Sequence, residues 1–108
     1  MTEAELHKQI TRLCTARGLW WFHAYDMRRG VQGEGEWART ASGAGFVDVI
    51  IVGNRGALFV EEKSADGRRS KAQMRWADRI VRAGLAYRMW RPCDLADGTI
   101  AAELDTIR

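Results

Sequence analysis

The stretch GFVDVIIVGNRGALFVEEKS, residues 45–64, contains two hydrophobic segments that carry four charged side chains. Asp48 lies inside the first segment, and Glu61, Glu62 and Lys63 end the second. Burying an unpaired ionised group costs several kcal/mol, so charges in such segments are normally paired, hydrogen-bonded or bound to a metal. The stretch therefore needs a chemical explanation as well as a structural one.

The two segments, FVDVIIV and ALFVEEK, are rich in β-branched and aromatic residues and predict two β-strands. The four residues between them, GNRG at 53–56, tolerate the backbone angles of a tight turn, so we expect a hairpin. Both strands are apolar on both faces, which indicates central strands in a sheet covered by helices on each side.

The alternation of side chains along a strand places the charged residues 61–63 on different faces of the sheet. Residues two apart in a strand share a face, so Glu61 and Lys63 point one way and Glu62 points the other way. If the hairpin brings Asp48 alongside, two carboxylates and a lysine meet at one end of the sheet. Two hard oxygen ligands suit Mg²⁺ or Mn²⁺, which keep several waters and bind phosphate. The alternative is a plain Glu61–Lys63 ion pair, with Asp48 accepting hydrogen bonds from backbone amides.

The segment before the hairpin predicts a helix, a strand and a long loop. Thr2 and Glu5 form a capping-box pattern, apolar residues recur at helical spacing, and Gly18 ends the run. LWWFHAY, residues 19–25, is typical of a strand. The glycine-rich loop that follows has no period, and loops of this length are usually either functional, for example in contacting substrate, or poorly ordered. Its candidate contact residues are Arg28, Arg29, Trp37 and Arg39.

After the hairpin, Ser70 opens a helix that runs to about Ala83, and LAYRMW predicts a fourth strand. We expect one short helix after Pro92, with Ile100, Leu104 and Ile107 on one side. The expected order is helix, three strands, helix, strand, helix. The predicted fold class is α/β, with a mixed four-stranded sheet flanked by helices, in a single domain over residues 1–108.

Composition narrows the class of protein. At 108 residues, with 46% hydrophobic and 29% charged residues, the chain is typical of one soluble domain. Neither a signal-peptide pattern nor a run of about 18 apolar residues occurs, so we expect a cytoplasmic protein that is not secreted. Cys14 and Cys93 show no metal-binding or disulfide spacing.

Positive charge is concentrated in one part of the chain. Residues 66–91 contain eight basic and two acidic side chains, a local net charge of +6. Such a cluster favours binding to a polyanion, because neutralising phosphates releases counterions. Its alternative is an ordinary solvated surface.

The order and spacing of these motifs resemble the PD-(D/E)xK nuclease superfamily, with GFVD followed by EEK and then a basic helix. Within it the chain resembles the stand-alone, virus-type VRR-NUC nucleases, a family similar in fold to archaeal Holliday junction resolvases. The resemblance covers TEAELHKQI, GFVDVIIV, FVEEKSADGRRSKAQMRW and AGLAYRMWRP. Val47 stands where the superfamily name has proline, a residue that supplies no ligand.

The resemblance implies a restriction-endonuclease-like core in which Asp48 and Glu61 are metal ligands and Lys63 is the catalytic lysine. It also implies a glutamate on the first helix. Glu3 lies on the helix face of Leu6 and Ile10, whereas Glu5 points away, so Glu3 is the predicted third ligand and catalytic residue. His7, one turn later, is either a water-mediated contact of the site or a partly buried polar residue.

The resemblance further implies that Gln73, at the start of the second long helix, faces the active site. Ser70 and Gln73 also form a capping-box pattern, and the two roles are compatible. The predicted phosphate contacts are Arg68, Arg69, Lys71 and Arg75. Four tryptophans are expected in the core: Trp20, Trp21, Trp76 and Trp90.

Together these patterns predict a Mg²⁺- or Mn²⁺-dependent DNA endonuclease that prefers branched DNA, such as four-way junctions or flaps. A single small domain with one active site must be doubled to cut two strands symmetrically, so we expect a homodimer. The first alternative is a DNA-binding module that keeps the fold without cleavage. The second is an interaction domain in which the charged strand end is only an ion pair.

Overall fold

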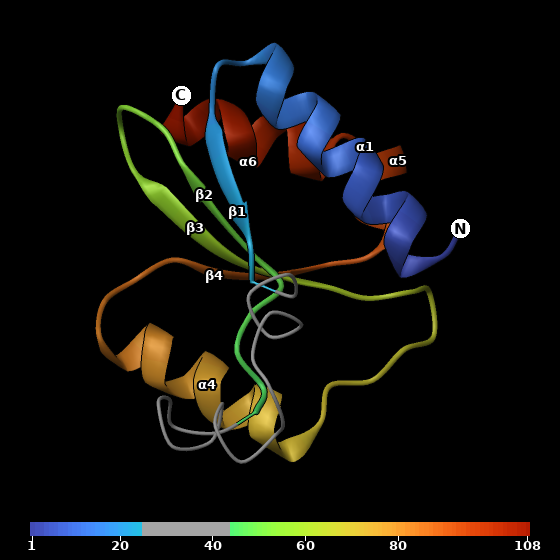
Figure 1. The fold of residues 1–108 in the computed structure, drawn as a ribbon, viewed down its shortest axis with the longest axis vertical. Coiled ribbons are helices and arrows are strands. Elements are labelled where there is room, and N and C mark those ends of the chain that lie inside the picture. Colours follow the sequence, from blue (N-terminus) through green and yellow to red (C-terminus); the bar gives the residue numbers. More distant parts are fainter. Residues whose placement is uncertain (25–43) are drawn as a thin grey trace, which may run out of the picture.

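A computed structural model describes residues 1–24 and 44–108 of the chain. Its described part is a four-stranded sheet with helices on both faces, as the sequence predicts (Figure 1). The strands lie side by side in chain order: β1 (Trp20–His23), β2 (Val49–Val52), β3 (Ala57–Glu62) and β4 (Tyr87–Trp90). The first two pairings are antiparallel and the third is parallel, so the sheet is mixed.

The predicted hairpin is confirmed. β2 and β3 pair from Val49 opposite Val60 to Val52 opposite Ala57. The backbone N–H of Gly53 donates to the carbonyl of Gly56 at 2.9 Å and closes the turn. These two strands are the central strands of the sheet, which explains why both of their faces are apolar.

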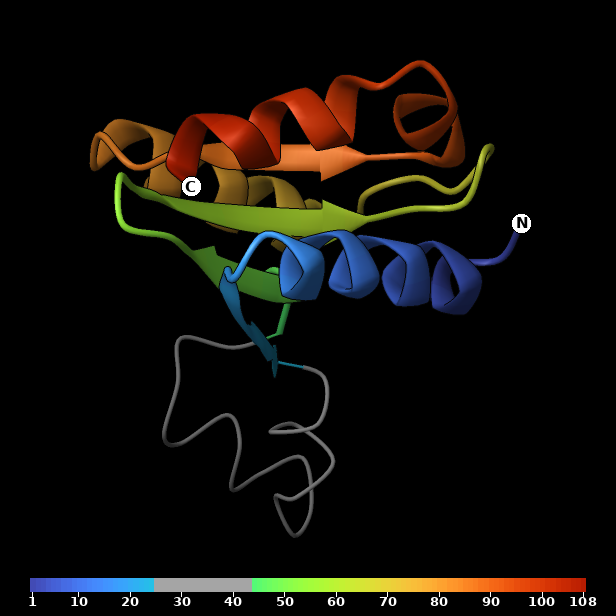
Figure 2. The same ribbon diagram turned by 90° about the horizontal axis from the view of Figure 1, so that it is seen from above.

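The helices form two layers. On one face lie α1 (Glu3–Ala16), α5 (Pro92–Ala96) and α6 (Thr99–Ile107), and on the other lies α4 (Lys71–Arg82), as the second view also shows (Figure 2). Helix α1 begins after Thr2, which forms the predicted capping box with Glu5. Helix α4 begins in the same way after Ser70, with Gln73. Among the described residues, no helix combines the length and the apolar character needed to cross a membrane.

The main core lies between the sheet and the layer of α1 and α6. Strand residues that point to this side alternate with residues that point toward α4. The buried set comprises Leu6, Ile10, Cys14, Leu19, Val49, Ile51, Leu58, Val60, Trp90, Ile100, Leu104 and Ile107. It includes Ile100, Leu104 and Ile107, which were predicted to lie on one side of a C-terminal helix.

The C-terminal region differs from the expectation of one helix. It contains two helices, α5 and α6, separated at Asp97 and Gly98. Gly98 has φ of 85°, a left-handed conformation that interrupts a right-handed helix. The carboxylate of Asp97 accepts a hydrogen bond from the N–H of Thr99 at 2.9 Å, at the first residue of α6.

The expectation that four tryptophans lie in the core is wrong for two of them. Trp90 is 1% exposed, but Trp20 is 81% exposed and Trp21 is also exposed. The reason is the position of β1 at the edge of the sheet. Trp20 lies opposite the exposed Val52, and Trp21, on the α1 face opposite Ile51, contacts His7 but is still 41% exposed. Trp76 is partly buried and lies on α4.

We predict that Gly53→Ala destabilises the protein by about 1–3 kcal/mol, the cost of overpacking a close-packed site. A Cβ at this position would lie 1.9 Å from the carbonyl oxygen of Ile107, so α6 would have to move. Asn54→Ala, in the same turn but exposed, is the matched control and should cost less than about 0.5 kcal/mol. Urea unfolding measures both values, and equal stability of the two variants would contradict the prediction.

Candidate active site

Asp48 is held against the end of β3 by two backbone contacts. Its own N–H donates to the carbonyl of Val60 at 2.9 Å. Its carboxylate oxygen Oδ2 accepts a hydrogen bond from the N–H of Glu62 at 2.7 Å. The hairpin therefore brings Asp48 alongside the charged strand end, as the sequence predicts.

Gly45 explains how the chain reaches this position. It has φ of +101°, and a Cβ there would lie 2.5 Å from the backbone carbonyl carbon of Ala72. Both observations require glycine, since other residues rarely adopt this φ and would clash with α4. The segment that leads to Asp48 thus passes directly against the first turn of α4.

Glu61 points toward α4 and is bound there by Gln73. The Glu61 side chain is 1% exposed, and its Oε2 accepts a hydrogen bond from Gln73 Nε2 at 2.7 Å. The other end of the same amide, Oε1, accepts a hydrogen bond from the Ser70 N–H at 2.8 Å. Gln73 therefore caps α4 and fixes the buried carboxylate at the same time.

Glu62 points to the opposite face, as strand periodicity predicts. Its side chain is 4% exposed, and both carboxylate oxygens lie 2.9 Å from Nδ1 of His7 on α1. Burial raises the pKa of the Glu62 carboxyl, while the hydrogen bond and the charge of His7 lower it. The His7 ring in turn packs against His23, with ring centroids 4.0 Å apart. His7 is thus a partly buried polar residue that binds Glu62, which agrees with the second of its two expected roles.

Glu3 and Glu5 have different surroundings. Oε2 of Glu5 accepts the Thr2 N–H at 3.2 Å within the capping box. Glu3 is exposed in the first turn of α1. After burial, the charges of Asp48 and Glu3 also raise the pKa of Glu62, so Glu3 lies near this end of the sheet. The ligand role of Glu3 stays a prediction.

Lys63 directly follows β3, and its backbone continues the pairing of β3 with β4. Its backbone N–H donates to the carbonyl of Trp90 at 3.0 Å, so the parallel ladder continues one residue past the strand. Alternation then places the side chain on the face of Glu61. Within residues 1–24 and 44–108, no ion pair joins the Lys63 ammonium to a carboxylate. The structure gives no support to the plain ion pair considered above.

Tyr87 belongs to this cluster and was missed by sequence reasoning. It pairs with Phe59 in the parallel register, which places it on the face of Glu61, and its hydroxyl oxygen is buried. Burial raises the pKa of Tyr87, and the adjacent Arg69 lowers it. The charges of Glu61 and Asp48 raise this pKa as well, so both carboxylates lie near the hydroxyl. Predicting that Tyr87 belongs to the site requires the register in which β3 and β4 pair, and no short sequence motif gives that register.

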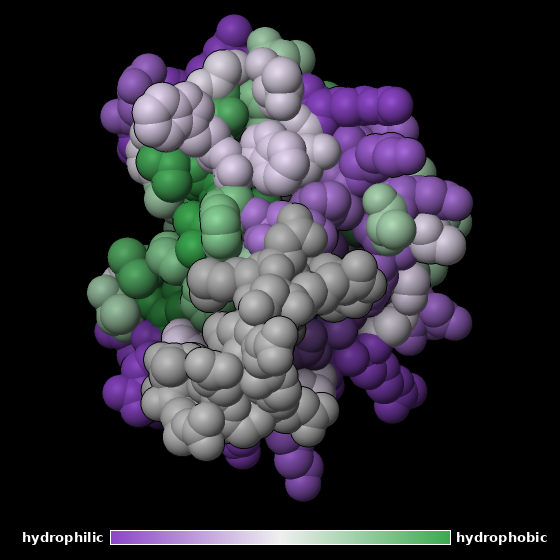
Figure 3. All heavy atoms as spheres, viewed as in Figure 1, coloured by the Kyte–Doolittle hydropathy of each residue, from purple (hydrophilic) through white to green (hydrophobic). Residues whose placement is uncertain are grey.

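Basic residues surround this end of the sheet. The predicted phosphate contacts Arg68, Arg69, Lys71 and Arg75 are all exposed. The loop that carries the first two is anchored by Arg91, whose Nη1 donates to the carbonyl of Ser64 at 2.7 Å. Hydrophilic side chains gather on this side of the molecule, over the start of α1 and the loop after β3 (Figure 3). The other predicted contacts, Arg28, Arg29, Trp37 and Arg39, lie outside the described residues.

The carboxylates of Asp48 and Glu61 could supply some of the ligands of a hard divalent cation. Asp48, directly before β2, and Glu61, on β3, supply two carboxylates, and Mg²⁺ commonly binds through one or two carboxylates plus waters and substrate phosphates. Among the described residues, no three His, Cys, Asp or Glu side chains converge as a closed metal site. The arrangement therefore fits an open site completed by water and substrate.

Comparison with known proteins supports the fold. A solved structure described as a "VRR_NUC domain protein" matches with a TM-score of 0.66 and 17% sequence identity. The match covers 96% of this chain and 90% of that chain. No family model and no curated protein matches the sequence. The shared fold confirms the α/β architecture expected from the VRR-NUC resemblance.

We predict that Gln73→Glu destabilises the protein by about 1–3 kcal/mol at pH 7, the range for a buried polar group that loses its partner. The new carboxylate keeps an oxygen for the Ser70 N–H but replaces the amide donor beside Glu61 with a second negative charge. Urea unfolding is the measurement. Ser70→Ala, which removes only the cap, is the control and should cost about 1 kcal/mol. A Gln73→Glu protein as stable as the parent would contradict the assignment.

Proposed function

We propose that the protein is a metal-dependent nuclease that hydrolyses phosphodiester bonds in DNA. One observation carries the proposal: the Asp48 carboxylate is fixed by the Glu62 N–H at the strand end where the buried Glu61 points to the same side as Lys63. A fold shared with a VRR_NUC domain protein supports it.

Asp48 and Glu61 would hold Mg²⁺ or Mn²⁺. Glu3 is the proposed third ligand from α1, and its exposed side chain would have to turn toward them, since no three such side chains converge among the described residues. Bound there, the cation supplies Lewis acidity toward the scissile phosphate and a lower pKa for a coordinated water. Both carboxylates are fixed before any ligand arrives, because Glu62 and Gln73 already hold them. Little reorganisation would accompany binding.

The remaining residues would act on the substrate directly or through these carboxylates. Lys63 would orient the attacking water and offset negative charge that develops on the phosphate. Gln73 is a positioning residue, because it contacts Glu61 and sets the direction of its carboxylate. The exposed basic residues of the loop after β3 would contact the DNA backbone, which fixes the register of the duplex without reading its sequence.

We further propose that the substrate is branched DNA and that the active form is a homodimer. One active site cuts one strand, and a pair of sites related by a two-fold axis cuts two strands symmetrically. The sequence resemblance to enzymes similar to junction resolvases supports this choice.

A DNA-binding module without cleavage is the second candidate. The clustered basic residues are compatible with it. The buried Glu61 and the partly buried, fixed Asp48 carboxylate argue against it, since a binding module gains nothing from two acidic groups held at one place beside a polyanion.

We predict that Asp48→Ala and Lys63→Ala each lower the cleavage rate at least about 100-fold, the scale on which loss of a catalytic acid-base or electrostatic group acts. The assay uses labelled four-way junction, flap and linear duplex with Mg²⁺, Mn²⁺ or EDTA. The parent should cut at least one substrate with one of the metals and none with EDTA.

Asp78→Ala and Lys8→Ala are the matched controls, because both remove an exposed charge of the same kind from a helix surface. They should cut at the parent rate. If neither metal supports cutting of any substrate, or if Asp48→Ala and Lys63→Ala cut as fast as the controls, the proposed function is wrong.

A further inference from the structure

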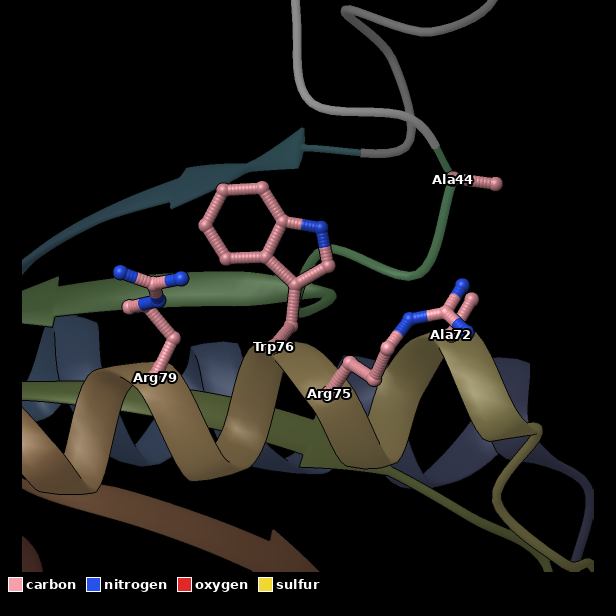
Figure 4. Close-up of a pocket in the computed structure, with 5 residues that line it drawn as sticks. All are labelled: Ala44, Ala72, Arg75, Trp76 and Arg79. Carbon is pink, nitrogen blue, oxygen red and sulfur yellow. The ribbon is translucent and has the colours of Figure 1, made fainter.

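A hollow of about 460 Å³ lies against α4, on the side away from β4 (Figure 4). The described residues that line it are Ala44, Ala72, Arg75, Trp76 and Arg79. All but Ala44 are spaced along one face of α4, with the Trp76 indole projecting between Arg75 and Arg79. A volume of this size is in the range of small-ligand sites, which are about 300–1,000 Å³.

The two arginines are available to an anionic ligand. Within the described residues, neither Arg75 nor Arg79 forms an ion pair, and both are exposed. Arg82, on the same helix, differs because its guanidinium lies 3.0 Å from the carboxylate of Asp78. The planar guanidinium is well suited to phosphate, which it can bind through two parallel hydrogen bonds.

Trp76 adds an aromatic surface between these cations. Its indole makes a T-shaped contact with Phe46, with ring centroids 4.9 Å apart and an angle of 75° between the planes. This contact fixes the ring and covers at most one of its two faces. A fixed indole beside two cations has the chemistry of a nucleotide site, because bases stack on aromatic rings while arginines hold the phosphates.

The hollow adjoins the candidate active site through two chain connections. Ala72 immediately precedes Gln73, whose amide binds Glu61. Ala44 precedes Gly45, which packs against α4 and leads to Asp48. Gln73 and Trp76 are three residues apart on α4, less than one turn, so a DNA strand whose phosphate lies at Asp48 and Glu61 can extend to the hollow.

We propose that this hollow binds one unpaired nucleotide of a DNA strand, adjacent to the phosphate that is cut. The base stacks on Trp76, and the flanking phosphates contact Arg75 and Arg79. Stacking needs an unpaired base, since the faces of a paired base are covered by its neighbours in the duplex. The site thus favours DNA with unpaired residues near the cut, and this consequence for cleavage rests on the proposed nuclease function.

The test measures binding of a fluorescein-labelled ten-residue oligo(dT) in EDTA by fluorescence anisotropy. Arg75→Ala/Arg79→Ala should weaken binding at least about tenfold. It should also make the plot of log association constant against log salt concentration less steep by about 1.4, since each of the two lost phosphate contacts accounts for about 0.7 with single-stranded DNA. Trp76→Leu should weaken binding about tenfold and Trp76→Phe much less, because phenylalanine still stacks. Thermal unfolding of each variant checks that it is folded.

Arg12→Ala/Arg82→Ala is the matched control, since it removes the same charge from two exposed positions outside the hollow. It should bind oligo(dT) within about twofold of the parent, as expected for loss of distant, screened charge. The proposal is overturned if the control loses as much affinity as Arg75→Ala/Arg79→Ala, or if Trp76→Leu and Trp76→Phe bind equally well.

The same variants separate this inference from the proposed function. EDTA prevents metal-dependent cutting, so the binding result stands whether or not the protein is a nuclease. If the parent cuts flap DNA and Arg75→Ala/Arg79→Ala cuts it equally well at subsaturating substrate, the hollow has no role in cleavage although the nuclease assignment holds. If no DNA is cut but binding changes as expected, the hollow is confirmed and the nuclease assignment fails.

Discussion

The hydrogen bond from the Glu62 N–H to the Asp48 carboxylate fixes the relation between the two central strands at the end where the charges lie. A slip of one residue in this pairing would exchange the faces of Glu61 and Glu62. Asp48 would then lose its donor, and Glu61 would turn away from Gln73 into the core beside α1. The glycine at position 45 makes the register possible, since it lets the chain pass close to α4 before reaching Asp48.

Because of this register, two adjacent glutamates serve different purposes. Glu61 is held by Gln73 on the α4 side, where it lies close to Tyr87 and on the same face as Lys63. Glu62 is buried against His7 on the α1 side, where burial raises the pKa of its carboxyl. Each buried carboxylate has a polar partner, which reduces the cost of burying both in so small a domain.

Local patterns were sufficient to predict most of the fold. Capping residues, helical spacing and the turn at residues 53–56 fixed the main elements, because their energetics depend on neighbours in sequence. Exposure of Trp20 depends on the order of the strands, and Tyr87 reaches the site only through the parallel pairing with Phe59. The hollow at Trp76 likewise depends on contacts between distant segments. The helix break at Gly98 was within reach of local reasoning, because a glycine just past a helical segment commonly ends the helix.

The most direct test of this account is Mn²⁺ binding to the parent, Glu61→Gln and Glu62→Gln, measured by electron paramagnetic resonance of the free ion. The account predicts that Glu61→Gln weakens binding at least about tenfold, since a charged ligand is replaced by a neutral one. Glu62→Gln should bind Mn²⁺ within about threefold of the parent, because its side chain points to His7 and only its backbone contacts Asp48. Equal loss of affinity in the two variants, or no loss in either, would contradict the assignment of the two faces.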